Sequence, residues 1–162
     1  MSMDDLPKDP ASSHKPMRWG TLVEAYQQAV YWCELPEQYV AIRIGQMHPT
    51  LDSALAQHAI HDWAYITAYN PFSQRSTPQQ NRAMNRQLAD DLGRRGYTYW
   101  RGSGIDLAGA WPPEASFLVL GIDRVVACDL ARTYDQNAIV AGHIGEAAEL
   151  IVLSNPSSPH SA

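Results

Sequence analysis

Extended and helical sequence patterns alternate along the chain, and this alternation limits the fold classes open to it. Segments rich in β-branched and aromatic residues, typical of strands, lie at 38–44, 63–68, 97–101, 115–121, 136–141 and 149–153. Helical spacing of apolar residues is found at 21–33, 50–59, 78–95 and 123–134. Repeated strand–helix–strand units favour an α/β fold. We therefore predict a single α/β domain with a mixed, mostly parallel sheet of five to six strands and about four helices.

The helical connections also predict where the ends of the strands lie. Strands joined by a crossover helix run in the same direction, so 38–44, 63–68 and 97–101 should end at one edge of the sheet. No helix separates 97–101 from 115–121, so these two should pair antiparallel, and 115–121 and 136–141 should begin at that edge. Ligands bind outside the carboxyl ends of strands in open α/β sheets. We therefore expect a binding site at this edge.

Polar side chains gather at the predicted edge. The candidate ligand-binding residues are Asn70, Ser73, Arg75, Asn81, Glu114, Ser116, Gln136 and Asn137. Thr77, Pro78 and Gln80 form a helix start with a capping box, and the free N–H groups of such a start suit an anion. Glu114 and Ser116 alternate on one strand and so share a face, where a carboxylate beside a hydroxyl can polarise a substrate. The alternative is an internal hydrogen-bond network, because buried polar groups need partners.

The histidines do not support a metal site. His58 and His61 lie three residues apart beside Asp62, a spacing that can hold a metal. The topology places them away from the polar edge, however, and supplies no third ligand. His48 follows the first predicted strand and is the histidine placed to act as a general base at the polar edge. We predict no metal and no cofactor, since the glycines of 102–104 also lack the third glycine of a dinucleotide-binding loop.

Charge and composition narrow the classes of partner. The chain has 12 Lys+Arg and 17 Asp+Glu, a net charge of −5, and so lacks the basic character that nucleic-acid binding requires. The chain has two lysines, Lys8 and Lys15, and both precede the predicted domain. The domain therefore contains no Schiff-base or Walker A lysine.

No stretch approaches the ~20 apolar residues of a membrane helix. Cys33 and Cys128 form no CxxC pair, and we expect them to stay reduced. We expect a cytoplasmic protein that binds neither nucleic acid nor membranes, and the oligomeric state stays open.

The two ends of the chain differ in composition from the segment between them. Residues 1–18 and 154–162 are rich in Pro and Ser and show no hydrophobic period. Such segments are typical of disordered tails. The predicted domain therefore spans residues 19–153.

Three motifs carry a family resemblance. They are YITAYNPFSQ with Asn81 and Asn85 after it, then WPPEASFLVLGI, then LARTYDQNAIV. Together they resemble the domain of unknown function 3293 family, a group of uncharacterised bacterial proteins. The resemblance implies no established activity. Combined with the polar edge, it leads us to expect a protein that binds a small polar or anionic ligand where the NPFS, PEAS and QNA segments meet. The alternative is a non-catalytic interaction or regulatory module whose polar cluster is structural.

Overall fold

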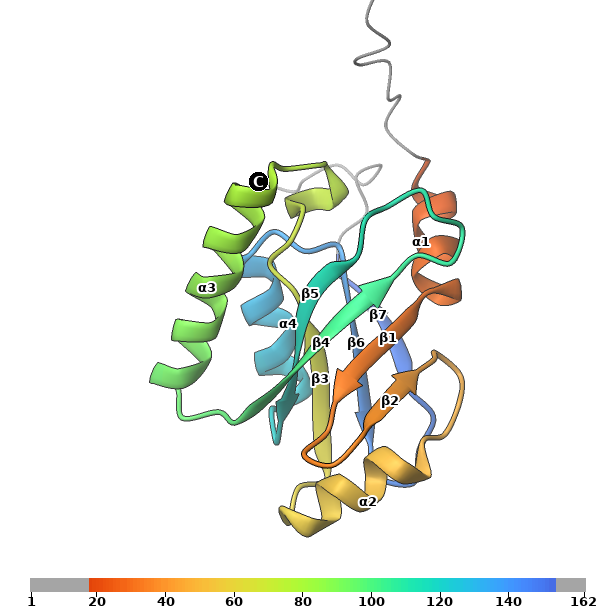
Figure 1. Ribbon diagram of the computed structural model, residues 1–162, viewed down its shortest axis with the longest axis vertical. Coiled ribbons are helices and arrows are strands. Elements are labelled where there is room, and N and C mark those ends of the chain that lie inside the picture. The colour runs from red at the N-terminus through yellow and green to blue at the C-terminus, as the bar shows by residue number, and fades with distance from the viewer. Residues whose placement is uncertain (1–17, 154–162) are drawn as a thin grey trace, which may run out of the picture.

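The computed structural model describes residues 18–153, which contain four α-helices, one short 3₁₀ helix and seven strands (Figure 1). The helices are α1 (Trp19–Gln28), α2 (Pro49–Gln57), α3 (Pro78–Arg94), α4 (Arg124–Thr133) and the 3₁₀ helix η1 (Pro71–Ser73). The strands are β1 (Val30–Glu34), β2 (Tyr39–Ile42), β3 (Asp62–Ile66), β4 (Tyr99–Ile105), β5 (Glu114–Leu120), β6 (Ala138–His143) and β7 (Glu149–Val152).

The seven strands form one antiparallel sheet. Their order is β2-β1-β4-β5-β3-β6-β7, and every neighbouring pair is antiparallel. The prediction of a mostly parallel sheet of five to six strands is therefore wrong. A crossover helix fixes the relative direction of the strands it joins, but it does not make them neighbours. Here β5 lies between β3 and β4, which α3 connects, and β3 lies between β5 and β6, which α4 connects.

The extra strand comes from a segment that the sequence assigned to a helix. We predicted one helix over 21–33, but α1 ends at Gln28 and Val30 begins β1. β1 pairs with β2 on one side and with β4 on the other, so sheet pairing outweighs the helical spacing there. Residues 102–104, which lie beyond the end of the strand predicted at 97–101, form part of β4. The capping box of Thr77 and Gln80 at the start of α3 is confirmed.

The sheet curls so that its two edge strands approach each other (Figure 1). Gly45 N donates to the Ala148 carbonyl at 2.8 Å, and Ala148 N donates to the Gln46 carbonyl at 3.0 Å. These bonds join the segment after β2 to the segment before β7. We call the side enclosed by the curl the inner face. One core cluster there combines Trp63 and Leu118 from the middle of the sheet with residues from both edges.

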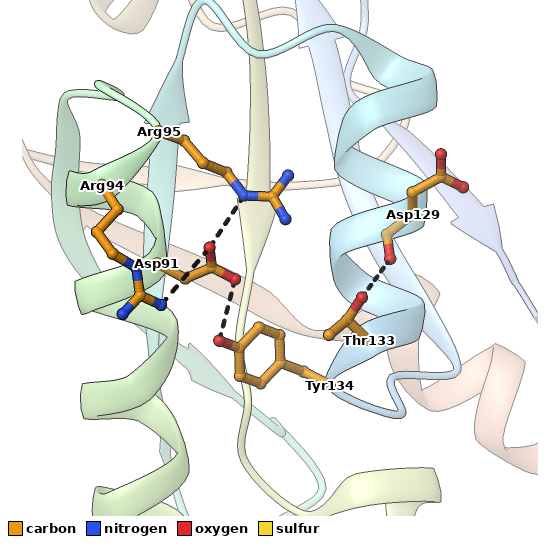
Figure 2. Close-up of polar contacts among 6 residues, drawn as sticks. All are labelled: Asp91, Arg94, Arg95, Asp129, Thr133 and Tyr134. Atoms are coloured by element: carbon orange, nitrogen blue, oxygen red, sulfur yellow. Dashed lines mark hydrogen bonds and ion pairs between the residues drawn. The ribbon is translucent and has the colours of Figure 1, made fainter.

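Helices cover the two faces differently. On the outer face, α3 and α4 pack against β3, β5 and β6 in a second core cluster. Figure 2 shows how the two helices are tied together: the Tyr134 hydroxyl after α4 donates to Asp91 Oδ2 on α3 at 3.3 Å. On the inner face, α2 buries Leu51 and Leu55 at one end of the curl. The other end is bordered by α1, which packs against β7.

Three further predictions concern the cysteines, membrane-spanning helices and the ends of the chain. Cys33 and Cys128 are free thiols in separate core clusters. Within residues 18–153, no helix is both long and apolar enough to span a bilayer. The two predicted tails, 1–18 and 154–162, lie outside the described residues except for Arg18, which is exposed just before α1.

Candidate functional site

A pocket opens on the inner face at the end of the curl that α2 does not fill. Its cavity has a volume of about 110 Å³, which is large enough for a small molecule or several waters. α1 forms one wall, and the ends of β4, β5 and β6 and the turn after β3 form the others. The apolar part of the lining comes mainly from α1, β6 and β7: Leu22, Ala25, Ala29, Ala138, Ile139, Val140 and Leu150.

Asn70 organises the polar side of this pocket. Its Nδ2 donates to Glu114 Oε1 at 2.8 Å, and its Oδ1 accepts from Ser76 N and Asn81 Nδ2, both at 3.0 Å. Asn81 Oδ1 in turn accepts from Asn70 N at 2.8 Å. Each amide group therefore bonds the other residue, and together they fix the turn after β3 to the first turn of α3.

Two further amides brace the same turn. Asn85 Oδ1 accepts from Ala68 N at 3.0 Å, and Asn85 Nδ2 donates to the Ala115 carbonyl at 3.1 Å. Gln136 Nε2 donates to the carbonyls of Tyr69 and Tyr134, at 3.1 and 3.2 Å. These side chains satisfy backbone groups that would otherwise be buried without partners. Their first role in the fold is to hold β3, β5 and β6 together at the pocket.

The turn itself has an unusual backbone. Asn70, Phe72 and Ser73 have φ values of 48°, 54° and 55°, in the left-handed region that costs of order 1–3 kcal/mol for residues other than glycine. Contacts from other segments hold it in place. Phe72 N donates to the Asp135 carbonyl at 2.6 Å, and Ser73 Oγ accepts from Asn137 Nδ2 at 2.9 Å. Ser73 Oγ also hydrogen-bonds the Tyr26 hydroxyl from α1.

Glu114 is the carboxylate that faces the cavity. Oε1 accepts the bond from Asn70, while Oε2 has no hydrogen bond within residues 18–153. No fully buried side-chain oxygen or nitrogen lacks a partner in this part of the chain, so Oε2 is open to the cavity. Burial raises the pKa of Glu114, and the bond from Asn70 offsets part of that rise. The group is thus a carboxylate whose ionised form is poorly solvated.

Hydroxyl groups complete the polar lining, and most of them donate a hydrogen bond within the fold. The Tyr31 hydroxyl donates to the Tyr26 carbonyl at 2.6 Å, and the Tyr65 hydroxyl donates to the Trp32 carbonyl at 2.7 Å. Ser116 Oγ donates to the Glu114 carbonyl at 2.9 Å. Burial raises the pKa of both tyrosines, so they stay neutral phenols and offer oxygen lone pairs to the cavity.

The structure brings most of the predicted site residues together. The pocket is lined by Asn70, Ser73, Glu114, Ser116, Gln136 and Asn137. Asn81 lies behind Asn70 and contacts it directly. Their meeting follows from strand direction, because β3 and β4 do run opposite to β5 and β6. The directions deduced from the crossovers were right, although the strands are not neighbours.

Two residues expected at this edge lie elsewhere. Arg75 is exposed, donates to the Ala110 carbonyl and lies over the Trp111 ring at 5.2 Å. It therefore supports the loop of residues 106–113 between β4 and β5, which we call the rim loop, and does not line the cavity. His48 lies just before α2, where its Nε2 accepts from Arg43 N at 3.0 Å. Because the sheet curls, the end of β2 meets the loop before β7 instead of the end of β3. His48 is therefore not placed to act as a base at the pocket.

Sequence reasoning missed the residues that α1 and the rim loop contribute. Tyr26 and Tyr31 looked like parts of one amphipathic helix, and neither carries a local signal for a pocket. Asp106 in the rim loop does have a local signal, although it is a signal for a turn: an Asp three residues before Gly109 favours one. It accepts from Ala108 N at 3.1 Å through Oδ1, and from Ala110 N and Trp111 N at 2.9 and 3.1 Å through Oδ2.

A second hollow, with a volume of about 270 Å³, lies near the opposite end of β3 and β6. It contains His143, whose Nδ1 lies 2.7 Å from Asp62 Oδ1, and the contact with Asp62 raises the pKa of this imidazole. His143 also stacks on His61. Within residues 18–153, no group of three or more His, Cys, Asp or Glu side chains is placed to hold a metal ion.

Residues 66–139 match the family described as "Protein of unknown function (DUF3293)". The match confirms the resemblance over this segment. It runs from the end of β3 into β6 and includes Asn70, Glu114 and Gln136, whereas the pocket wall formed by α1 lies outside it. Comparison with the curated proteins and with the solved structures found no match.

Proposed function

We propose that this protein binds a small polar molecule in the inner-face pocket. The observation that carries the proposal is Glu114, whose Oε2 is open to a cavity of about 110 Å³. Apolar side chains of α1, β6 and β7 line one side of this cavity, and amide and hydroxyl groups line the other. Apolar pockets with a few oriented polar groups are the usual form of small-molecule sites. A buried carboxylate with a raised pKa is also typical of functional sites.

The strained turn after β3 supports the same proposal. Three left-handed residues in one short turn cost stability, and they position Asn70 to hold Glu114 in one orientation. A turn that served only to connect β3 to α3 would not need this conformation. Strain of this kind is common where a fold orients a binding group.

The expectation of an anionic ligand has less support. The start of α3 has its own capping box, and Asn70 Oδ1 already accepts from Ser76 N close to it. Arg75, the nearest candidate cation, is bonded to the rim loop. We therefore propose a polar ligand without a net negative charge.

The alternative is that the polar cluster is purely structural and the protein is an interaction or regulatory module. The bonds of Asn81, Asn85 and Gln136 to backbone groups favour that reading for these three residues. Glu114 differs, because one of its oxygens serves no bond of the fold. For localisation we propose the cytoplasm, a compartment that keeps thiols such as Cys33 and Cys128 reduced.

A filled pocket tests the proposal. Ala25 lies on α1 and lines the cavity, so Ala25→Trp should occupy the space a ligand needs. Gln27→Trp places the same side chain on the exposed side of the helix and serves as the control. The probes are single-ring fragments carrying an amine, an alcohol, an amide or a carboxylate, and binding is followed by ligand-observed NMR.

We expect at least one fragment to bind the wild type and the Gln27→Trp variant and to lose binding to Ala25→Trp. If every fragment that binds does so equally to all three proteins, the pocket is not the binding site. If no fragment binds at all, the structural reading of the cluster replaces the proposal.

A further inference from the structure

Many of the hydroxyl groups around the pocket have only lone pairs left for a ligand. Tyr31, Tyr65 and Ser116 have each donated their hydroxyl proton to a backbone carbonyl, and only lone pairs remain for a ligand. Gln136 has used its amide protons on the carbonyls of Tyr69 and Tyr134, which leaves its side-chain oxygen. Of the described hydroxyls in the lining, Tyr69 keeps its proton, because no bond of the fold uses its hydroxyl. The Tyr26–Ser73 pair also keeps one proton beyond the bond between its members.

The charges in the pocket are of one sign. Among the described residues of the lining, none is Lys, Arg or His, and the two ionisable acids are Asp106 and Glu114. Asp106 already accepts three backbone N–H bonds in the rim loop, so its charge is satisfied within the fold. Glu114 accepts one bond at Oε1 and has Oε2 available.

A pocket of this composition suits a ligand that brings donors and positive charge. We infer that the ligand is a small organic amine, whose ammonium group binds Glu114 and whose apolar body lies against Leu22, Ala25 and Leu150. The inference rests on the proposed function and specifies the ligand class for the same site. An ammonium has three donors and no acceptor, which complements a carboxylate surrounded by lone pairs. Tyr31 and Tyr65 also line the cavity, and aromatic rings attract cations.

Three probes of the same shape separate this inference from its alternatives. Benzylamine, benzyl alcohol and benzoate differ in charge but share one ring and one short arm, and their affinities are measured by titration calorimetry. We expect benzylamine to bind wild type about tenfold more tightly than benzyl alcohol, because hydrogen bonds between charged groups are about twice as strong as neutral ones. Benzoate should bind least.

Glu114→Gln removes the charge and keeps the shape. We expect about a tenfold loss of benzylamine affinity and less than a twofold change for benzyl alcohol. Glu37→Gln is the control, because Glu37 is exposed and far from the lining, and it should change neither affinity. Should Glu114→Gln fail to fold, the wild type at decreasing pH gives the same test: protonation of Glu114 should weaken benzylamine and leave benzyl alcohol unchanged.

The outcomes distinguish the inference from the proposed function. If benzyl alcohol or benzoate binds as tightly as benzylamine, and Ala25→Trp abolishes that binding, the pocket is a ligand site but the amine class is wrong. Benzylamine binding that Glu114→Gln and low pH leave unchanged also overturns the inference. So does a complete lack of benzylamine binding by the wild type.

Discussion

Glu114 shows how one residue serves both the fold and the pocket. Its Oε1 receives Asn70 Nδ2 and so helps to fix the strained turn, while its Oε2 faces the cavity. Burial disfavours the carboxylate and raises its pKa. Asn81, by contrast, uses both amide atoms on Asn70 alone. Neighbouring polar side chains thus differ in whether the fold leaves any bonding capacity free.

The raised pKa of Glu114 has a consequence for stability. When the folded-state pKa of a carboxyl lies above its unfolded value, its stabilising contribution is full below the unfolded pKa and is lost as pH rises through the folded pKa. Ionised Glu114 therefore destabilises the native state near pH 7. We predict that Glu114→Gln has a higher free energy of unfolding than wild type at that pH, and that the difference disappears near pH 4.

Urea unfolding of wild type, Glu114→Gln and Glu37→Gln at both pH values checks this prediction. Comparing variants at one pH cancels the titration of the other carboxyl groups. A Glu114→Gln variant that is clearly less stable than wild type near pH 7 would show that the charged form holds the turn together, and that Glu114 is a structural residue first.

At the scale of elements, the pocket depends on how closely β1 and β4 approach. Gly102 in β4 pairs with Cys33 in β1. A Cβ at Gly102 would lie 2.1 Å from the Trp32 carbonyl oxygen and 2.5 Å from the Tyr65 hydroxyl. These are the two atoms of the hydrogen bond that anchors Tyr65 in the pocket. The glycine is therefore required by strand contact, not by a ligand-binding loop.

We predict that Gly102→Ala destabilises the protein by several kcal/mol, of order 2–4, because the backbone must shift or the Tyr65 bond must break. Gly93→Ala is the matched control: Gly93 lies in α3 with nothing within 4 Å of an added Cβ, and there alanine should stabilise by about 0.5–1 kcal/mol. Thermal or urea unfolding measures both. Equal and small effects of the two substitutions would contradict the strand spacing described here.

At the scale of the whole molecule, the sequence allowed strand direction to be predicted. Of the strand neighbours, it allowed only the antiparallel pair of β4 and β5 to be predicted. Crossover helices identified which strand ends share an edge, and that was sufficient to bring Asn70, Glu114 and Gln136 together. Which strand lies between two others depends on long-range pairing, for which local patterns carry no signal. For the same reason β1 was missed, since its pairing with β2 and β4 decides its conformation.

The curl of the sheet could not be predicted from the sequence either, and it determines the rest of the site. It removes His48 from the polar edge and encloses the inner face between α1 and α2. The part of the apolar wall that α1 forms, together with Tyr26 and Tyr31, belongs to a segment far from the polar motifs in sequence. The meeting of the polar residues could therefore be predicted from the strand ends. The cavity beside them could be found only in the three-dimensional structure.

We propose that the inner-face pocket is where this protein binds its ligand. The most direct measurement is a benzylamine titration of ¹⁵N-labelled protein, followed by backbone amide chemical shifts. We predict saturable shifts for Gly104, Ser116 and Asn137, which line the pocket, and none for Ala83 and Gly93 on α3. Saturable shifts confined to α3, α4 or the hollow near His143, with the pocket amides unchanged, would contradict the claim.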